Sequence, residues 1–102
     1  MLFRSVRLAI ELAATSGIAW VGTRNSNHAG AGGVYVSMLT DAGLIGLYGA
    51  VSGFNQMAPW GGAEPLLGTN PLAIGIPAGK RPAVIIDTAT SVASAEIGRA
   101  HV

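Results

Sequence analysis

The sequence has 102 residues, of which half are hydrophobic and 11% are charged, with a net charge of +1. This length allows at most one small domain, and the near-neutral charge excludes the clustered basic face that nucleic-acid binding requires. The charged fraction is well below the roughly 25% of an average soluble domain, so we expect much of the surface to be covered by other protein. The absence of cysteine excludes disulfides and thiolate metal sites and is consistent with a cytoplasmic location.

Neither a secretion signal nor a membrane segment is predicted. Arg4, Arg7 and Glu11 interrupt the apolar core that a signal sequence would need. The uncharged stretch 42–63 contains Pro59 and six glycines, which disfavour a membrane-spanning helix. We therefore expect a cytoplasmic protein that does not bind membranes.

The chain begins with an expected helix and strand. Five apolar residues recur at helical spacing and so share one face: Leu2, Val6, Ala9, Ile10 and Ala13. Gly17 suits the position that ends this helix, because glycine accepts a left-handed backbone. The apolar run 18–21 then predicts a short strand.

A second helix is predicted after residue 33, where apolar residues recur every three or four positions until Gly43 ends the pattern. Strands are predicted at 44–51, 72–76 and 83–86, the first buried on both faces and the last two joined by a turn at 77–80. Asp87 ends the last strand, and a further helix, which Asp87 could cap, is expected from residue 88. This alternation predicts an α/β domain with a mixed sheet and flanking helices.

Residues 24–33, RNSNHAGAGG, place His28 between an expected strand and a glycine-rich helix start. An imidazole can exchange a proton near neutral pH and so act as an acid or a base. The glycines let backbone N–H groups approach a ligand, and a helix start favours an anionic group. The alternative for His28 is an ordinary hydrogen-bonded turn residue.

Three polar clusters follow predicted strand ends, at 25–28, 52–68 and 87–91. Ligands in open α/β sheets usually bind at strand ends, and long structured loops such as 52–68 are usually functional. Thr69 lies in a Gly-Thr-Asn-Pro turn that is either structural or ligand-binding. The glycine clusters do not fit the G-x-G-x-x-G fingerprint, and no His, Asp or Glu spacing predicts a metal site.

Three segments in this order resemble the malate/L-lactate dehydrogenase family of NAD(P)-dependent oxidoreductases, which includes ureidoglycolate and sulfolactate dehydrogenases. They are RNSNHAGAGG, QMAPWGGAEPLLGTNPLAIGIPAG and IIDTATSV. The resemblance runs from about residue 6 to residue 94 and implies a non-Rossmann NAD(P)-binding fold, here incomplete. Ala29 departs from the family pattern, which usually has an aromatic residue there; this loosens the packing beside His28 without removing its chemistry.

Carried over residue by residue, the resemblance implies that His28 is the acid/base group and that Thr69 faces the substrate. NAD or NADP would be bordered by Ala29, Gly30, Ala31, Gly32, Gly33, Ser52, Asp87, Thr88 and Ala89. The implied reaction transfers a hydride between NAD(P) and a small 2-hydroxy or 2-oxo acid of the malate or lactate type, in a homodimer. Two alternatives stay open: a reductase of the same family acting on a cyclic imine or a diketo acid, and a non-catalytic binding module.

The chain is expected to be a fragment, because an upstream Ser-His-Gly segment and arginine of the family have no counterpart in it. Residues 1–95 would belong to the catalytic and cofactor-binding core. Residues 96–102, EIGRAHV, look like the in-frame translation of a common sequencing adapter and are expected to be non-native. The alternative is a natural helix with Glu96 and Arg99 three residues apart. If the tail is non-native, His101 has no functional role.

Overall fold

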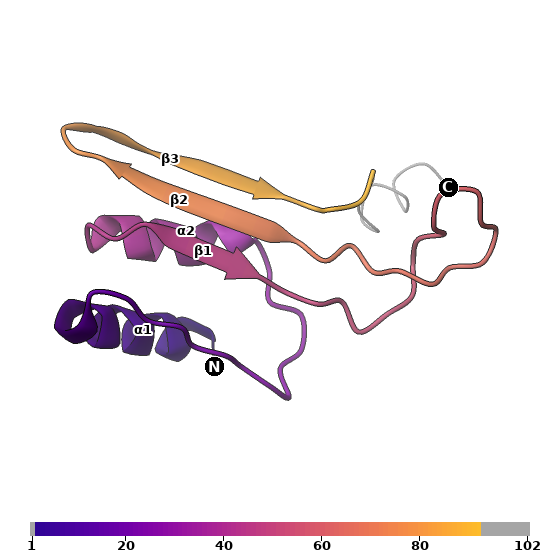
Figure 1. The fold of residues 1–102 in the computed structure, drawn as a ribbon, viewed down its shortest axis with the longest axis horizontal. Helices are drawn as coiled ribbons and strands as arrows, with labels where there is room; N and C mark the ends of the chain where they lie inside the picture. The colour runs from indigo at the N-terminus through magenta and orange to yellow at the C-terminus, as the bar shows by residue number, and fades with distance from the viewer. Residues whose placement is uncertain (1, 93–102) are drawn as a thin grey trace.

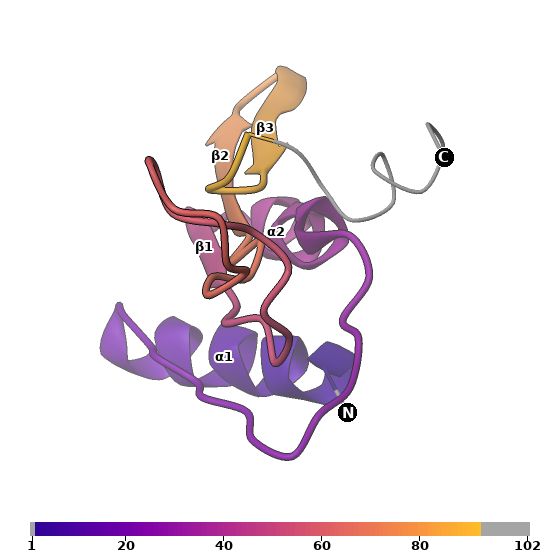
Figure 2. The same cartoon turned by 90° about the vertical axis from the view of Figure 1, so that its right-hand side faces the viewer.

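The structure, a computed structural model, describes residues 2–92 and contains two helices and three strands in these residues (Figure 1). The elements are α1 (Leu2–Ser16), α2 (Gly32–Asp41), β1 (Gly46–Gly49), β2 (Leu72–Ala78) and β3 (Arg81–Thr88). Helix α2 lies across one face of the sheet, and α1 packs against α2 (Figure 2). The first two predicted helices and the α/β class are confirmed.

The sheet has the order β1-β2-β3, and both neighbouring pairs are antiparallel. Strands β2 and β3 form the predicted hairpin, in which Gly79 adopts a positive φ of 63° that glycine accepts without strain. Because β1 and β3 each run opposite to β2, they run in the same direction. Their carboxyl ends therefore lie at the same end of the sheet, on either side of the start of β2.

The prediction of a mixed sheet is wrong for the described residues. The expected strand at 18–21 does not form there, and Ile18 and Trp20 are 82% and 89% exposed. An apolar run becomes a strand only where a sheet edge can take up its backbone hydrogen bonds, and here the chain runs back past α1 instead (Figure 1).

Two further expectations are corrected at strand ends. Strand β1 is shorter than the predicted 44–51, and Leu47 is 63% exposed, so it is not buried on both faces. Strand β3 continues to Thr88, and the described residues that follow it are not helical.

The core lies between α2 and the sheet. Tyr35 and Val36 of α2 are buried there together with Ala73 of β2. A Cβ atom at Gly75 would lie 2.9 Å from the carbonyl oxygen of Val36, so only glycine lets the helix approach this closely. The first helix joins this core through the ring of Phe3, whose centroid is 5.5 Å from that of Tyr35.

The opposite side of the sheet is not covered by any described element. Residues directly opposite each other in an antiparallel ladder have their side chains on the same face of the sheet. Ile74 pairs with Leu47 and Ile86, and Ile76 pairs with Val84, so all five lie on this uncovered side. We call this surface the open face; its residues are Leu47, Leu72, Ile74, Ile76, Val84 and Ile86. None of the described helices is long and apolar enough to cross a bilayer.

Candidate functional site

His28 is exposed and lies in the loop that leads into α2. Its Nδ1 accepts a hydrogen bond from the backbone N–H of Gly30 at 3.0 Å. Gly30 has a φ of 74°, a conformation that glycine adopts readily and that lets its N–H turn back toward the ring. A ring that accepts at Nδ1 carries its neutral-state proton on Nε2, so this contact fits the neutral imidazole and would be lost if Nδ1 were protonated.

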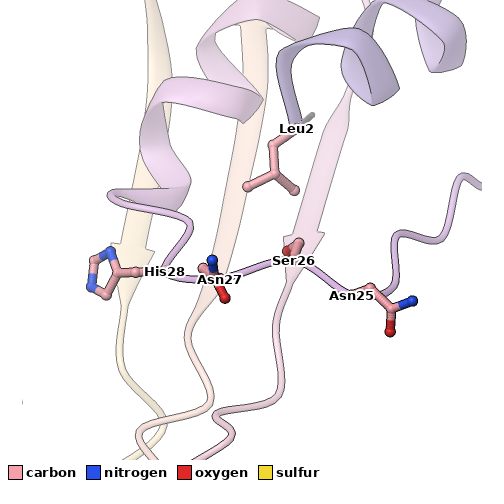
Figure 3. Close-up of a pocket in the computed structure, with 5 residues that line it drawn as sticks. All are labelled: Leu2, Asn25, Ser26, Asn27 and His28. Atoms are coloured by element: carbon pink, nitrogen blue, oxygen red, sulfur yellow. The ribbon is translucent and has the colours of Figure 1, made fainter.

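A shallow hollow of about 270 Å³ lies beside this histidine. It is lined by Leu2 at the start of α1 and by residues 25–28, and in Figure 3 the side chains of Asn25 and His28 lie at opposite ends of the set. Asn25 has a φ of 55°, which asparagine tolerates better than most residues. Ligand pockets usually enclose about 300–1,000 Å³, and this hollow lies just below that range.

The backbone beside His28 is held from α2. The hydroxyl of Tyr35 donates a hydrogen bond to the carbonyl oxygen of Ala29. The ring of Tyr35 in turn lies 5.2 Å, centroid to centroid, from that of Tyr48 in β1. The small side chain of Ala29 was expected to loosen the packing beside His28, but the main chain of Ala29 is held by this hydrogen bond.

The start of α2 is capped by a residue from the sheet. Ala31, at the N-cap position, offers no side-chain acceptor, and the first turn contains no acidic residue. Instead, Oδ2 of Asp87 in β3 accepts a hydrogen bond from the backbone N–H of Gly33 at 2.7 Å. A side-chain cap stabilises a helix by about 0.5–2 kcal/mol. Asp87 therefore caps a helix that lies before it in the sequence, and the described residues that follow it, 89–92, are not helical.

Two predicted cofactor-bordering glycines have packing roles in this arrangement. Gly32 is buried, and a Cβ there would lie 2.7 Å from Cδ1 of Tyr48. A Cβ at Gly33 would lie 3.2 Å from Oδ2 of Asp87. The anion that this helix start holds is the protein's own carboxylate, and a cofactor contact at either glycine stays a prediction.

A second cluster forms where β1 and β3 end. The backbone N–H of Ser52 donates to Oδ1 of Asn70 at 2.8 Å. The backbone N–H of Thr90 donates to the carbonyl oxygen of Thr69 at 3.0 Å. The hydroxyl of Thr90 donates to the carbonyl oxygen of Asn70, also at 3.0 Å. Gly68 packs directly on Ser52, since a Cβ at Gly68 would lie 2.7 Å from Oγ of Ser52.

The structure thus brings Ser52, Thr69 and the residues just after β3 to one end of the sheet, and Asp87 joins this end to the start of α2. Thr88 closes the strand, and its hydroxyl donates to the carbonyl oxygen of Ala89. The hollow beside His28 is lined by none of Ser52, Thr69 and Asp87, so their meeting in one cleft stays a prediction.

Sequence reasoning assigned no site role to Tyr35 or Thr90, and it left the turn that contains Asn70 as either structural or ligand-binding. The Asn-Pro pair at residues 70 and 71 does indicate a turn, and the φ of 39° at Asn70 fits that assignment. The apolar helical pattern conceals the hydroxyl of Tyr35, and nothing local relates Thr90 to Thr69. Residues 2–92 contain no group of three or more potential metal ligands among His, Cys, Asp and Glu side chains.

Tyr48 connects the site to the stability of the fold. Burial raises the pKa of its phenol above the ordinary value of 10.0, and the neighbouring Tyr35 and Asp87 raise it further. Because the pKa of Tyr48 is higher in the folded than in the unfolded state, its protonated phenol contributes to the free energy of unfolding. This contribution is complete below about pH 10 and is lost as the pH rises through the folded pKa. We predict that Tyr48→Phe reduces the alkaline loss of unfolding free energy, measured by urea denaturation of the full-length protein from about pH 9 to about pH 11. Parallel losses in both proteins would contradict the prediction.

The fold and these clusters define an α/β unit whose candidate catalytic histidine precedes a helix capped from the sheet. The family model for malate/L-lactate dehydrogenase matches residues 1–101, a range that includes most of the tail predicted to be non-native. The chain belongs to this family. The origin of residues 96–102, which lie outside the described residues, stays a prediction.

Relatives from three organisms show the extent of the similarity. The chain is 42% identical over 90 residues to a malate dehydrogenase of Pyrococcus abyssi, covering 88% of this chain and 24% of the relative. It is 42% identical over 86 residues to a 2,3-diketo-L-gulonate reductase of Klebsiella oxytoca, covering 84% of this chain and 25% of the relative. The crystal structure of a malate dehydrogenase from Entamoeba histolytica superposes with a TM-score of 0.90 at 36% identity, covering 98% of this chain and 27% of that one. The chain spans about a quarter of the length of these proteins.

Proposed function

We propose that this chain is part of a longer NAD(P)-dependent dehydrogenase that interconverts a small 2-hydroxy acid and its 2-oxo acid, of the malate or lactate type. The observation that carries the proposal is the placement of His28 in a chain of this family. Its ring is exposed, borders a hollow, and is oriented by the backbone of Gly30. An oriented imidazole that solvent and substrate can reach is suited to acid/base chemistry.

The residues at the sheet end fit part of a nicotinamide cofactor. Ser52 and Thr88 each donate their hydroxyl hydrogen to a backbone carbonyl, and Oγ of Ser52 also accepts from the backbone N–H of Phe54. One lone pair on Oγ of Ser52 and those on the hydroxyl of Thr88 are left for an amide or ribose donor. The start of α2 does not fit a phosphate group, because Asp87 already binds the N–H of Gly33. A Rossmann site would use such a helix start for the pyrophosphate. This difference supports a non-Rossmann mode of cofactor binding.

A bound nicotinamide supplies the hydride exchange at the substrate carbon. In the oxidation direction, the substrate hydroxyl replaces the Gly30 N–H at Nδ1 of His28 and transfers its proton there. The ring keeps its other proton on Nε2 and becomes an imidazolium. In the reduction direction, the imidazolium returns the Nδ1 proton to the carbonyl oxygen, and the Gly30 contact forms again. Thr69 would face the substrate in both directions.

The experiment is an assay of the full-length protein for the appearance or loss of NAD(P)H absorbance. The substrates are malate, lactate, their 2-oxo acids, a diketo acid and a cyclic imine, each with NAD and with NADP. Turnover of a 2-hydroxy or 2-oxo acid supports the proposal. Cofactor binding without turnover of any substrate would favour a non-catalytic binding module.

A reductase acting on a diketo acid is the second candidate, because a relative as similar as the malate dehydrogenase is named a 2,3-diketo-L-gulonate reductase. Faster turnover of the diketo acid than of malate and lactate would select it; faster turnover of the cyclic imine would select the other alternative. We further propose, on the family resemblance, that the enzyme is a cytoplasmic homodimer.

A further inference from the structure

We propose that Asp87 is a positioning residue whose carboxylate fixes the start of α2 and, through it, the loop that carries His28. This inference rests on the proposed role of His28. It gives Asp87 a task that differs from bordering a cofactor, since its Oδ2 bonds to the backbone N–H of Gly33.

The start of α2 is intrinsically weak. Its first two residues are Gly32 and Gly33, and glycine in a helix costs about 1 kcal/mol relative to alanine. Gly32 cannot be exchanged for a better helix former, because a Cβ there would lie 2.7 Å from the Tyr48 ring and 3.1 Å from Cβ of Ala73. Ala31 supplies no cap. The close packing of α2 on the sheet therefore requires residues that disfavour a helix start, and Asp87 compensates for them.

Three of the hydrogen bonds that hold the segment from His28 to Gly33 involve a side chain. His28 bonds to Gly30 within the loop, and Ala29 bonds to Tyr35 of α2. The bond from Gly33 to Asp87 is the one of these three that reaches the sheet. Without it, the first turn of α2 loses its cap at Gly33, and of these three bonds only the one from Tyr35 to Ala29 still ties the His28 loop to the helix. The imidazole is then held less firmly relative to the sheet.

Asp87 also sets this position relative to the other cluster. It pairs with Ala73 in the ladder, one residue before the end of β3, and its side chain is directed to the α2 side of the sheet. The residues that follow it reach the turn containing Thr69 through Thr90. One residue thus joins the proposed acid/base loop to the end of the sheet where the substrate and cofactor contacts are expected.

The test uses the full-length enzyme with Asp87→Ala, Asp87→Asn and, as a matched control, Asp41→Asn at the exposed opposite end of α2. We expect Asp87→Ala to lower kcat about 10- to 100-fold, the order of loss that misplacing a catalytic group produces, with cofactor Kd within about twofold. Asp87→Asn should restore most of kcat, because its amide oxygen can accept the same hydrogen bond. Asp41→Asn should leave kcat unchanged.

A second readout does not depend on activity. Amide hydrogen exchange at Gly33, and at Gly30 in the His28 loop, should be faster in Asp87→Ala than in wild type, while β2 stays protected. Unchanged exchange, a raised cofactor Kd with normal kcat, or a lower Tm with normal kcat would each overturn the proposal. If instead His28→Ala keeps its activity while the exchange behaves as expected, the function assigned to His28 fails and the capping by Asp87 stands.

Discussion

His28→Ala in the full-length enzyme is expected to lower kcat by roughly 10²–10⁴-fold, the usual loss when a positioned acid/base group is removed. The physical reason is that the hydroxyl proton no longer has an acceptor as the hydride leaves the substrate carbon. Cofactor affinity should change little, because the role proposed for the ring is proton transfer. The measurements are steady-state kcat and KM together with the Kd of the cofactor in the absence of substrate.

Two controls separate the chemistry of the ring from its contribution to structure. Added imidazole should partly restore kcat in His28→Ala, since a free base can enter the space that the side chain leaves. His28→Gln keeps a polar side chain of similar reach but cannot transfer the proton, so it should be nearly as slow as the alanine variant. A near-normal kcat in either variant would contradict the acid/base assignment.

The helices and the hairpin could be predicted because their determinants are local. The periodic apolar face of α1, the end of its pattern at Gly17 and the turn at Gly79 all lie within the element concerned. The strand at 18–21 could not be judged in this way, because a strand depends on a partner that the run itself does not specify. Ile18 and Trp20 have the right composition for a strand but no pairing edge among the described residues.

The same distinction between local and long-range determinants applies to the candidate site. The polar residues that follow apolar runs indicate His28 and Ser52 as candidate site residues. The meeting of Ser52 with the end of β3 follows from the shared direction of β1 and β3, although the two strands are not neighbours. The capping of Gly33 by Asp87 links positions 54 residues apart, and only the path of the whole chain determines it.

Produced alone, the 102-residue chain is expected to aggregate and to have no dehydrogenase activity. The open face exposes large apolar side chains on all three strands, with Leu47, Val84 and Ile86 each more than half exposed. An apolar surface of this kind, with unpaired backbone along the outer edges of β1 and β3, favours association between copies. Only Tyr35, Val36 and Ala73 are buried hydrophobic residues in the described part, which is a small core for so much exposed apolar surface.

The design that tests this cause changes the open face without changing net charge. Ile76 and Val84 are directly opposite in the ladder, so Ile76→Glu with Val84→Lys replaces an apolar pair by an attractive cross-strand pair. This double variant should raise the soluble fraction of the isolated chain several-fold. Thr23→Glu with Gln56→Lys adds the same charges at exposed polar positions and should have little effect. Size-exclusion chromatography and centrifugation measure both, and a soluble wild-type monomer with a cooperative melt and NAD(P)H turnover would show that the open face needs no cover.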